Sequence, residues 1–375
     1  MEPEVVEAMA EVSKVFVNMH DLIDKACKRA AELCKVDAAH ITSGAAAGIT
    51  MSTAACIAGR DPVKWSNLPF TDDPPINGRN QILIQTNQSA YEEQYAAGGG
   101  RLVRVGGPGG TSATELEMAI NEKTAGIAAG YHYNTTPRGW VSYESLTGIA
   151  KRHDRPCFCD CAGAFPPFEN LHRVIEWGFD LAIFSGGKGI RGPQDTGLIL
   201  AGGDQGIELI EEIKKQSSPN MGFGRAYKVS KESIVGLVTA LELILSRDEQ
   251  AEYQKQLAKA EYMAKRLEDI PGVYVSVVPN DGKTYEHPMM ARTPTVRIDI
   301  DKEALGLTTV RSVYEWMQKG DPGIFIRFPR FEDREFGPFT NRASVFLFTY
   351  FLRSGEEKIV AERMRDVLTR HPWRK

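Results

Sequence analysis

The chain has 375 residues, of which 42% are apolar and 25% charged, and its formal net charge is −4 at pH 7. This size and composition are typical of an enzyme with one large domain and a smaller one. The acidic balance argues against nucleic acid as the main ligand. No apolar run reaches the roughly 20 residues of a membrane span. The six cysteines, and an acidic start in place of a basic leader, predict free thiols and a cytoplasmic setting.

The first segment, residues 4–35, has apolar residues at steps of three and four, with a break near residues 18–20. This spacing predicts two amphipathic helices. Helices this apolar need a surface to pack against, and a partner subunit is one candidate. We therefore expect residues 1–37 to pack on a partner subunit, in a homodimer or a higher homo-oligomer.

The middle of the chain alternates short apolar runs with helical stretches, which predicts an α/β fold with a mainly parallel sheet and helices on both faces. A short strand before Ser43 opens this region. Further strands are expected at residues 81–86, 102–105, 126–129, 156–160, 181–184 and 198–201. Ligands of such sheets bind at the carboxyl ends of the strands. Ser43, Asp160, Ser185 and Lys188 all lie at or just after predicted strand ends, so a shared site is expected there.

The last third of the chain has a different pattern. A long helical stretch covers residues 230–270. Beyond it we expect short strands at 273–278, 295–300, 324–328 and 344–348, with helices at 308–319 and 356–369. The pattern predicts a smaller α+β C-terminal domain over residues 251–375, after a large domain over residues 38–250. The boundary is expected inside the long helical stretch.

A single lysine, Lys188, lies among glycines in the segment Ser185-Gly186-Gly187-Lys188-Gly189. Glycines let the backbone approach a ligand closely. A lysine held there can be desolvated into a nucleophilic amine. The segment therefore predicts a Schiff-base lysine that carries pyridoxal phosphate. A glycine-rich surface turn with a solvated lysine is the alternative.

Asp160 lies at the end of a predicted buried strand, where a carboxylate requires a partner. The pyridinium nitrogen of pyridoxal phosphate is a suitable one. Ala162, two residues on, would lie under the ring. Cysteines at 157, 159 and 161 would all face one side of this strand. Zinc ligands usually stand further apart in the sequence, so we interpret the cysteines as buried apolar residues and expect no metal.

Two further segments have polar groups at strand ends. Ser43-Gly44-Ala45 opens an alanine-rich helix, and a helix start with uncovered N–H groups binds phosphate. A serine-capped core helix is the alternative. Asn134 follows the strand at 126–129 and is a candidate for a hydrogen bond to the ring oxygen of the cofactor. A simple turn is the alternative there.

Four stretches carry a family resemblance: residues 42–48, 160–162, 184–194 and 224–232. The third, Phe-Ser-Gly-Gly-Lys-Gly-Ile-Arg-Gly-Pro-Gln, is the most specific. Together they resemble the selenocysteine synthase-like group of fold type I pyridoxal-phosphate enzymes. This group includes seryl-tRNA selenium transferase and D-glucosaminate-6-phosphate ammonia-lyase. The resemblance implies the fold type I transferase architecture and pyridoxal 5'-phosphate as cofactor.

The resemblance also implies roles for individual residues. Lys188 would be the catalytic Schiff-base residue, and Asp160 would pair with the ring nitrogen. The phosphate would be held by Ser43, Gly44, Ala45 and Ser185. A residue that stacks on the ring is expected after the strand at 81–86, where the candidates are Asn87, Gln88 and Tyr91. Arg225 matches a family position near the cofactor or substrate.

A lysine-bound cofactor allows an α-proton to be removed from an amino acid. We favour α,β-elimination on an amino acid or amino-sugar acid, as in an ammonia-lyase or dehydratase. Arg327 is a candidate for binding the substrate carboxylate, with a surface arginine on an edge strand as the alternative. Racemisation, epimerisation and transamination would use the same residues. Two alternatives remain: selenium or sulfur transfer on seryl-tRNA, and a non-catalytic binding protein. We expect neither nucleic acid nor a membrane as a partner.

Overall fold

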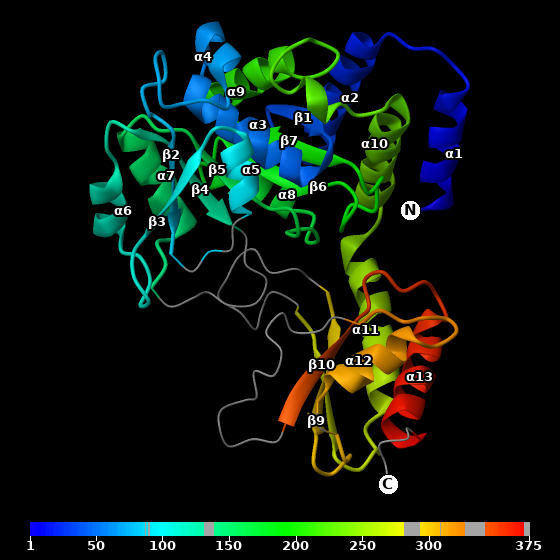
Figure 1. Ribbon diagram of the computed structural model, residues 1–375. Helices are drawn as coiled ribbons and strands as arrows, with labels where there is room; N and C mark the ends of the chain where they lie inside the picture. The colour runs from blue at the N-terminus through cyan, green and yellow to red at the C-terminus, as the bar shows by residue number, and fades with distance from the viewer. Residues whose placement is uncertain are drawn as a thin grey trace. The chain divides into compact units, whose positions relative to one another are not determined.

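Figure 1 shows a computed structural model of the protein. The structure describes residues 1–86, 88, 91–130, 139–280, 293–307, 309–326 and 342–370. The chain divides into two compact units. The first contains residues 1–247, and the second begins at Asp248. The first unit has the predicted α/β architecture, with a mainly parallel sheet, and the second has a small antiparallel sheet.

Seven strands form the sheet of the first unit, in the order β1-β7-β6-β5-β4-β2-β3. Neighbouring strands from β3 to β6 are parallel, but β7 is antiparallel to both β6 and β1. The connection between β6 and β7 contains no helix, so the chain reverses there instead of crossing over. The strands are β1 (Ala38–Thr42), β2 (Gln81–Gln85), β3 (Arg101–Val105), β4 (Thr124–Gly130), β5 (Cys157–Asp160), β6 (Leu181–Ser185) and β7 (Gly197–Ala201).

Helices cover both faces of this sheet, and each face has its own apolar core. Along β5, Phe158 faces one core while Cys157 and Cys159 face the other. On the Phe158 side lie α3 (Gly44–Ala58), α4 (Pro62–Asn67), α5 (Glu92–Ala97) and α9 (Gly203–Gln216). On the other side lie α2 (Met19–Cys34), α6 (Ala113–Ala119), α7 (Tyr143–Arg152), α8 (Asn170–Glu176) and α10 (Lys231–Leu245). All six cysteines are free and buried, which confirms that they act as core residues.

The amino-terminal helix α1 (Pro3–Ser13) packs along α10 of the same chain, as Figure 1 shows. Val5 is fully buried in this contact. Val6, Val15 and Phe16 remain exposed. The packing of these helices on a partner subunit stays a prediction, for which this exposed apolar surface is available.

The second unit has three antiparallel strands in the order β10-β9-β8 and one apolar core. Its elements are α11 (Glu249–Lys265), β8 (Val273–Val278), β9 (Thr295–Asp301), α12 (Arg311–Gln318), β10 (Arg342–Phe348) and α13 (Glu356–Arg370). The strand expected at residues 324–328 is wrong over 324–326, which form no strand, and its remainder lies outside the described residues. Within the described parts of the chain, no helix combines the length and apolarity needed to cross a membrane.

Candidate active site

The strand register brings the predicted site residues to one edge of the large sheet. Gly130 at the end of β4 pairs with Asp160 at the end of β5. Ser185 at the end of β6 pairs with Gly197, which in turn pairs with Thr42 at the end of β1. Because β7 is antiparallel, it begins at the edge where the other strands end. The carboxyl edge therefore gathers the ends of β1, β4, β5 and β6.

The start of α3 lies directly against this edge. A Cβ atom on Gly197 would collide with the backbone of Gly44 and Ala45, so only glycine lets the helix start come this close to β7. Ser43 occupies the N-cap position but makes no side-chain capping hydrogen bond, which argues against the alternative of a serine-capped core helix. Its half-buried hydroxyl and the first N–H groups of α3 can instead bind an anion.

Lys188 lies on a tight turn after β6. Arg191 N donates to Lys188 O at 3.0 Å, and Gly192 N donates to Gly186 O at 2.8 Å. Gly189 packs so closely on the carbonyl of Phe165 that a side chain there would collide with it. The turn is thus fixed by backbone contacts while the lysine side chain is exposed. Desolvation of this amine in the site with its cofactor bound stays a prediction.

Asp160 is partly buried at the end of β5, and burial raises the pKa of its carboxyl group. Two effects oppose this: Ala162 N donates to Asp160 Oδ1 at 3.0 Å, and the positive charge of Lys188 lies nearby. A carboxylate accepts more than one hydrogen bond. A cationic ring nitrogen is the kind of partner that would stabilise its ionised form.

Gln88 is buried beside the same strand ends. Its Oε1 accepts from Gly130 N at 3.0 Å, and Arg104 Nη1 donates to its carbonyl oxygen at 2.9 Å. Its Nε2 is buried without a hydrogen-bond partner among the described residues. Since Gly130 pairs with Asp160, this unpaired donor lies at the edge that holds Asp160. A buried unpaired N–H requires an explanation, and a ligand with an acceptor atom supplies one.

One residue at this edge, Gln85, was not predicted from the sequence and connects the end of β2 to Val141. Gln85 is fully buried at the end of β2 and exchanges two hydrogen bonds with Val141. Val141 N donates to its Oε1 at 2.7 Å, and its Nε2 donates to Val141 O at 3.2 Å. The signal in the sequence was a glutamine at the end of an otherwise apolar run.

Other predicted residues are placed differently. Arg225 lies on the short 3-10 helix η1 (Arg225–Tyr227), where its Nη1 donates to Ser218 Oγ at 3.4 Å. Within the described chain, no hydrogen bond or ion pair connects it with Lys188 or Asp160. Ala162 lies in a turn beyond the end of β5, and Tyr91 is an exposed N-cap of α5. The predictions for Asn87, Asn134 and Arg327 fall outside the described residues.

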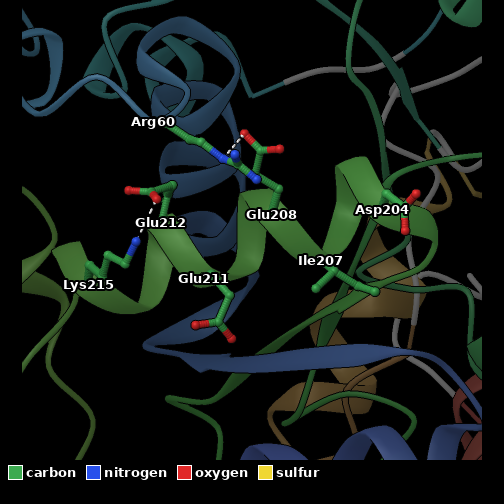
Figure 2. Close-up of a pocket in the computed structure, with 7 residues that line it drawn as sticks. All are labelled: Arg60, Asp204, Ile207, Glu208, Glu211, Glu212 and Lys215. Carbon is green, nitrogen blue, oxygen red and sulfur yellow. Dashed lines mark hydrogen bonds and ion pairs between the residues drawn. The ribbon is translucent and has the colours of Figure 1, made fainter.

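A separate surface hollow of about 590 Å³ lies over the outer face of α9 (Figure 2). Arg60 forms an ion pair with Glu208 at 2.5 Å, and Lys215 forms one with Glu212 at 2.7 Å. None of the predicted site residues that the structure describes lines this hollow. It is lined by Arg60, Asp204, Ile207, Glu208, Glu211, Glu212 and Lys215. Over the described ranges, no group of three or more His, Cys, Asp or Glu side chains is arranged to hold a metal.

The residues at the carboxyl edge fit pyridoxal phosphate. The cofactor has a basic ring nitrogen, a ring oxygen, an aldehyde and a phosphate. The edge offers a carboxylate, an unpaired amide donor, an exposed amine and an uncovered helix start. These groups come from β5, the segment after β2, the turn after β6 and the start of α3.

Comparison with known proteins gives several relatives, although no family model matches the chain. The 5'-C-glycyluridine monooxygenase-decarboxylase of a Streptomyces species is 30% identical over 331 residues, covering 86% of this chain and 77% of that protein. The D-glucosaminate-6-phosphate ammonia lyase of Salmonella typhimurium is 26% identical, with 87% and 82% covered. The L-seryl-tRNA(Sec) selenium transferase of Aquifex aeolicus is 29% identical but matches only 49% of this chain and 44% of that protein.

Solved structures share the fold. A D-glucosaminate-6-phosphate ammonia-lyase has a TM-score of 0.77 at 24% identity, covering 98% of this chain and 91% of that one. A serine palmitoyltransferase that carries pyridoxal phosphate has a TM-score of 0.58 at 11% identity, with 98% and 84% covered. The expected cofactor and fold are thus confirmed: this chain belongs to the selenocysteine synthase-like family of fold type I pyridoxal-phosphate enzymes.

Proposed function

We propose that this enzyme eliminates a β-leaving group from an amino acid or amino-sugar acid, releasing ammonia and a keto acid. The observation that carries the proposal is the position of Lys188 close to Asp160, at the edge where α3 begins. The long match to an ammonia lyase supports elimination as the reaction. The residue roles below are part of the proposal.

When bound, pyridoxal phosphate supplies an electron sink that acidifies the α-C–H bond of the attached amino acid. The chain itself must hold the cofactor and move the protons. Asp160 would keep the ring nitrogen protonated, and Gln88 Nε2 would donate to the ring oxygen. Ser43, the first N–H groups of α3 and Ser185 would bind the phosphate.

Lys188 would carry the protons of the elimination. Its Nζ, as the free amine, accepts the α-proton of the substrate. The resulting ammonium then donates a proton to the β-hydroxyl, the carbon–oxygen bond breaks, and water leaves. The exposed side chain on a turn whose backbone is held by hydrogen bonds supports this role. The unsaturated product takes up water and releases ammonia and the keto acid.

Ammonia and keto acid should be measured over β-hydroxy amino acids and phosphorylated amino-sugar acids. The expected result is equal amounts of both products, with no turnover by Lys188→Ala. Inversion of the α-carbon without keto acid would instead support racemisation or epimerisation. Amino-group transfer to an added keto acid would support transamination.

A second candidate is oxygen-dependent decarboxylation. It is favoured by the 30% identity to the monooxygenase-decarboxylase, which exceeds the 26% identity to the ammonia lyase. The test is oxygen uptake and carbon dioxide release, with amino acids and glycyl-nucleosides as substrates. Elimination needs no oxygen, so turnover that stops under nitrogen would reject elimination in favour of this reaction.

We also propose that the protein is a cytoplasmic homo-oligomer. The apolar surface at the amino terminus supports the oligomer: Val6 and Val15 are about half exposed, and Phe16 is fully exposed. Phe16→Ser with Val15→Ser should lower the molar mass in solution, as measured by light scattering. An unchanged mass would place the interface elsewhere.

A further inference from the structure

The helix α1 is fixed to the rest of the first unit at both of its ends. At its carboxyl end, Lys231 Nζ donates to Ser13 O at 3.3 Å and to Val15 O at 2.9 Å. At its amino end, Glu2 Oε1 accepts from Arg191 Nη1 at 3.1 Å and forms an ion pair with Arg247 Nη2 at 3.2 Å. Since Lys231 begins α10 and Arg247 follows it, α1 runs antiparallel along α10.

The amino end of α1 thereby contacts the segment that carries Lys188. Arg191 is three residues after Lys188, and its N–H closes the lysine turn by donating to Lys188 O. Arg191 has a φ of 62°, which is unfavourable for a residue with a side chain, so its conformation needs support. Further along, Met9 of α1 and Pro193 both pack over Gly236 of α10.

The ion pairs of Glu2 are partly shielded from solvent. The side chains of Glu2, Arg191 and Arg247 are 30%, 22% and 29% exposed. Burial acts to raise the pKa of Glu2, but Arg247 and Arg191 outweigh it and hold this pKa below its ordinary value. The carboxylate thus remains charged at neutral pH, and charge-assisted hydrogen bonds of this kind are stronger than neutral ones.

We propose that Glu2 is a positioning residue for the cofactor lysine: by binding the Arg191 side chain at the amino end of α1, it fixes the turn that carries Lys188. This inference rests on the proposed role of Lys188. It adds a residue from the amino-terminal helix that does not itself reach the cofactor. Loss of the Glu2 carboxylate should loosen the turn and weaken cofactor binding, without unfolding α1, because Val5, Met9 and Lys231 still hold that helix.

The test compares Glu2→Gln with Glu4→Gln. Both remove one negative charge at the amino end of α1, Glu2 from the N-cap position and Glu4 from the first turn. Glu4 is exposed, and no ion pair or hydrogen bond of its side chain is found among the described residues. Cofactor affinity is measured by titrating the apoprotein with pyridoxal phosphate and following the visible absorbance. Glu2→Gln should raise the dissociation constant about fivefold, and Glu4→Gln less than about twofold.

Two further measurements separate the possible outcomes. Thermal unfolding of the apoproteins should be alike in the two variants. If Glu2→Gln lowers stability but leaves the dissociation constant unchanged, its role is merely structural and the inference is overturned. Borohydride reduction and peptide mapping of the wild type should label Lys188. An unlabelled Lys188 would overturn the proposed function and this inference together, whereas normal labelling with equal affinities in both variants would overturn the inference alone.

Discussion

Each edge of the large sheet holds a partly buried aspartate, and the two differ in what surrounds them. Asp160 ends β5 at the carboxyl edge, and Asp180 precedes β6 at the amino edge. Each accepts a backbone hydrogen bond, from Ala162 N at 3.0 Å and from Cys157 N at 2.7 Å. Burial raises the pKa of both carboxyl groups, to about 6 for Asp180.

The surroundings assign the two aspartates different roles. Asp160 lies near an exposed lysine and an unpaired amide donor, and α3 starts at its edge. Asp180 connects elements of the fold: its carboxylate holds the start of β5, and its carbonyl accepts from Gly202 N at 3.3 Å. A raised carboxyl pKa alone therefore does not mark an active site. What distinguishes Asp160 is its surroundings, which among the described residues offer an exposed lysine, an unpaired amide donor and an uncapped helix start.

The largest effect is expected for Asp160→Asn. The amide still accepts from Ala162 N but cannot carry the charge that would stabilise a protonated ring nitrogen. Activity should fall by about 100-fold or more, while the free energy of unfolding of the apoprotein at pH 7 should not fall. Steady-state rates and denaturant unfolding measure the two quantities. Full activity of Asp160→Asn would contradict the assignment of Asp160 to the active site and of Asp180 to the fold.

The second-largest effect is expected for one of two glycine variants, Gly197→Ala and Gly206→Ala, which are compared as a pair. Each new methyl group would collide with backbone, that of Gly44 at the carboxyl edge and that of Asp180 at the amino edge. Both should lower the free energy of unfolding by about 1–3 kcal/mol. Only Gly197→Ala should also weaken cofactor binding, by roughly tenfold or more, because it displaces the start of α3. Equal cofactor affinities in the two variants would place the phosphate away from α3.

Asp180→Asn should change stability in a pH-dependent way. The ordinary pKa of 3.8 is raised to about 6, so the folded state favours the neutral carboxyl group. The stability that this group contributes is complete below about pH 3.8 and is lost as the pH rises through 6. Asparagine cannot ionise, so the variant should gain about 2 kcal/mol relative to the wild type between pH 4 and pH 7. Unfolding at several pH values tests this, and cofactor affinity should stay unchanged.

The smallest effect is expected for Ser43→Ala. Its hydroxyl makes no capping bond, so the apoprotein should unfold at the same temperature. Loss of one hydrogen bond to phosphate should raise the cofactor dissociation constant about threefold to tenfold. Ser112→Ala is the matched control, since Ser112 caps α6 through a capping box. Ser112→Ala should lose stability and keep its cofactor affinity. If Ser43→Ala instead lost stability and kept its cofactor affinity, Ser43 would be a cap of α3 and not a phosphate ligand.

Much of the architecture could be predicted because it rests on local patterns. The apolar strand runs and the break before α2 both appear in the structure. The direction of β7 could not be predicted in this way, since alternating strands and helices suggested a crossover. Only the missing helix between β6 and β7 pointed to a reversal.

The site was predictable to a similar extent. Residues such as Asp160 and Ser185 were placed correctly at one edge because they lie at the ends of predicted strands. The exposure of Lys188 and the unpaired Nε2 of Gln88 could not be foreseen, because both depend on contacts between distant segments. The same holds for the contact of Glu2 with Arg191, which connects the beginning of the chain to its middle.

The antiparallel direction of β7 also bears on the order of folding. The strands β6 and β7 are neighbours in the sequence, so the turn with Lys188 is closed by local contacts, which form quickly. The strand β1, by contrast, reaches β7 from far away in the chain and must close a long loop before it pairs. We therefore expect the lysine turn to take shape early in folding, and the phosphate-binding start of α3 to join it late.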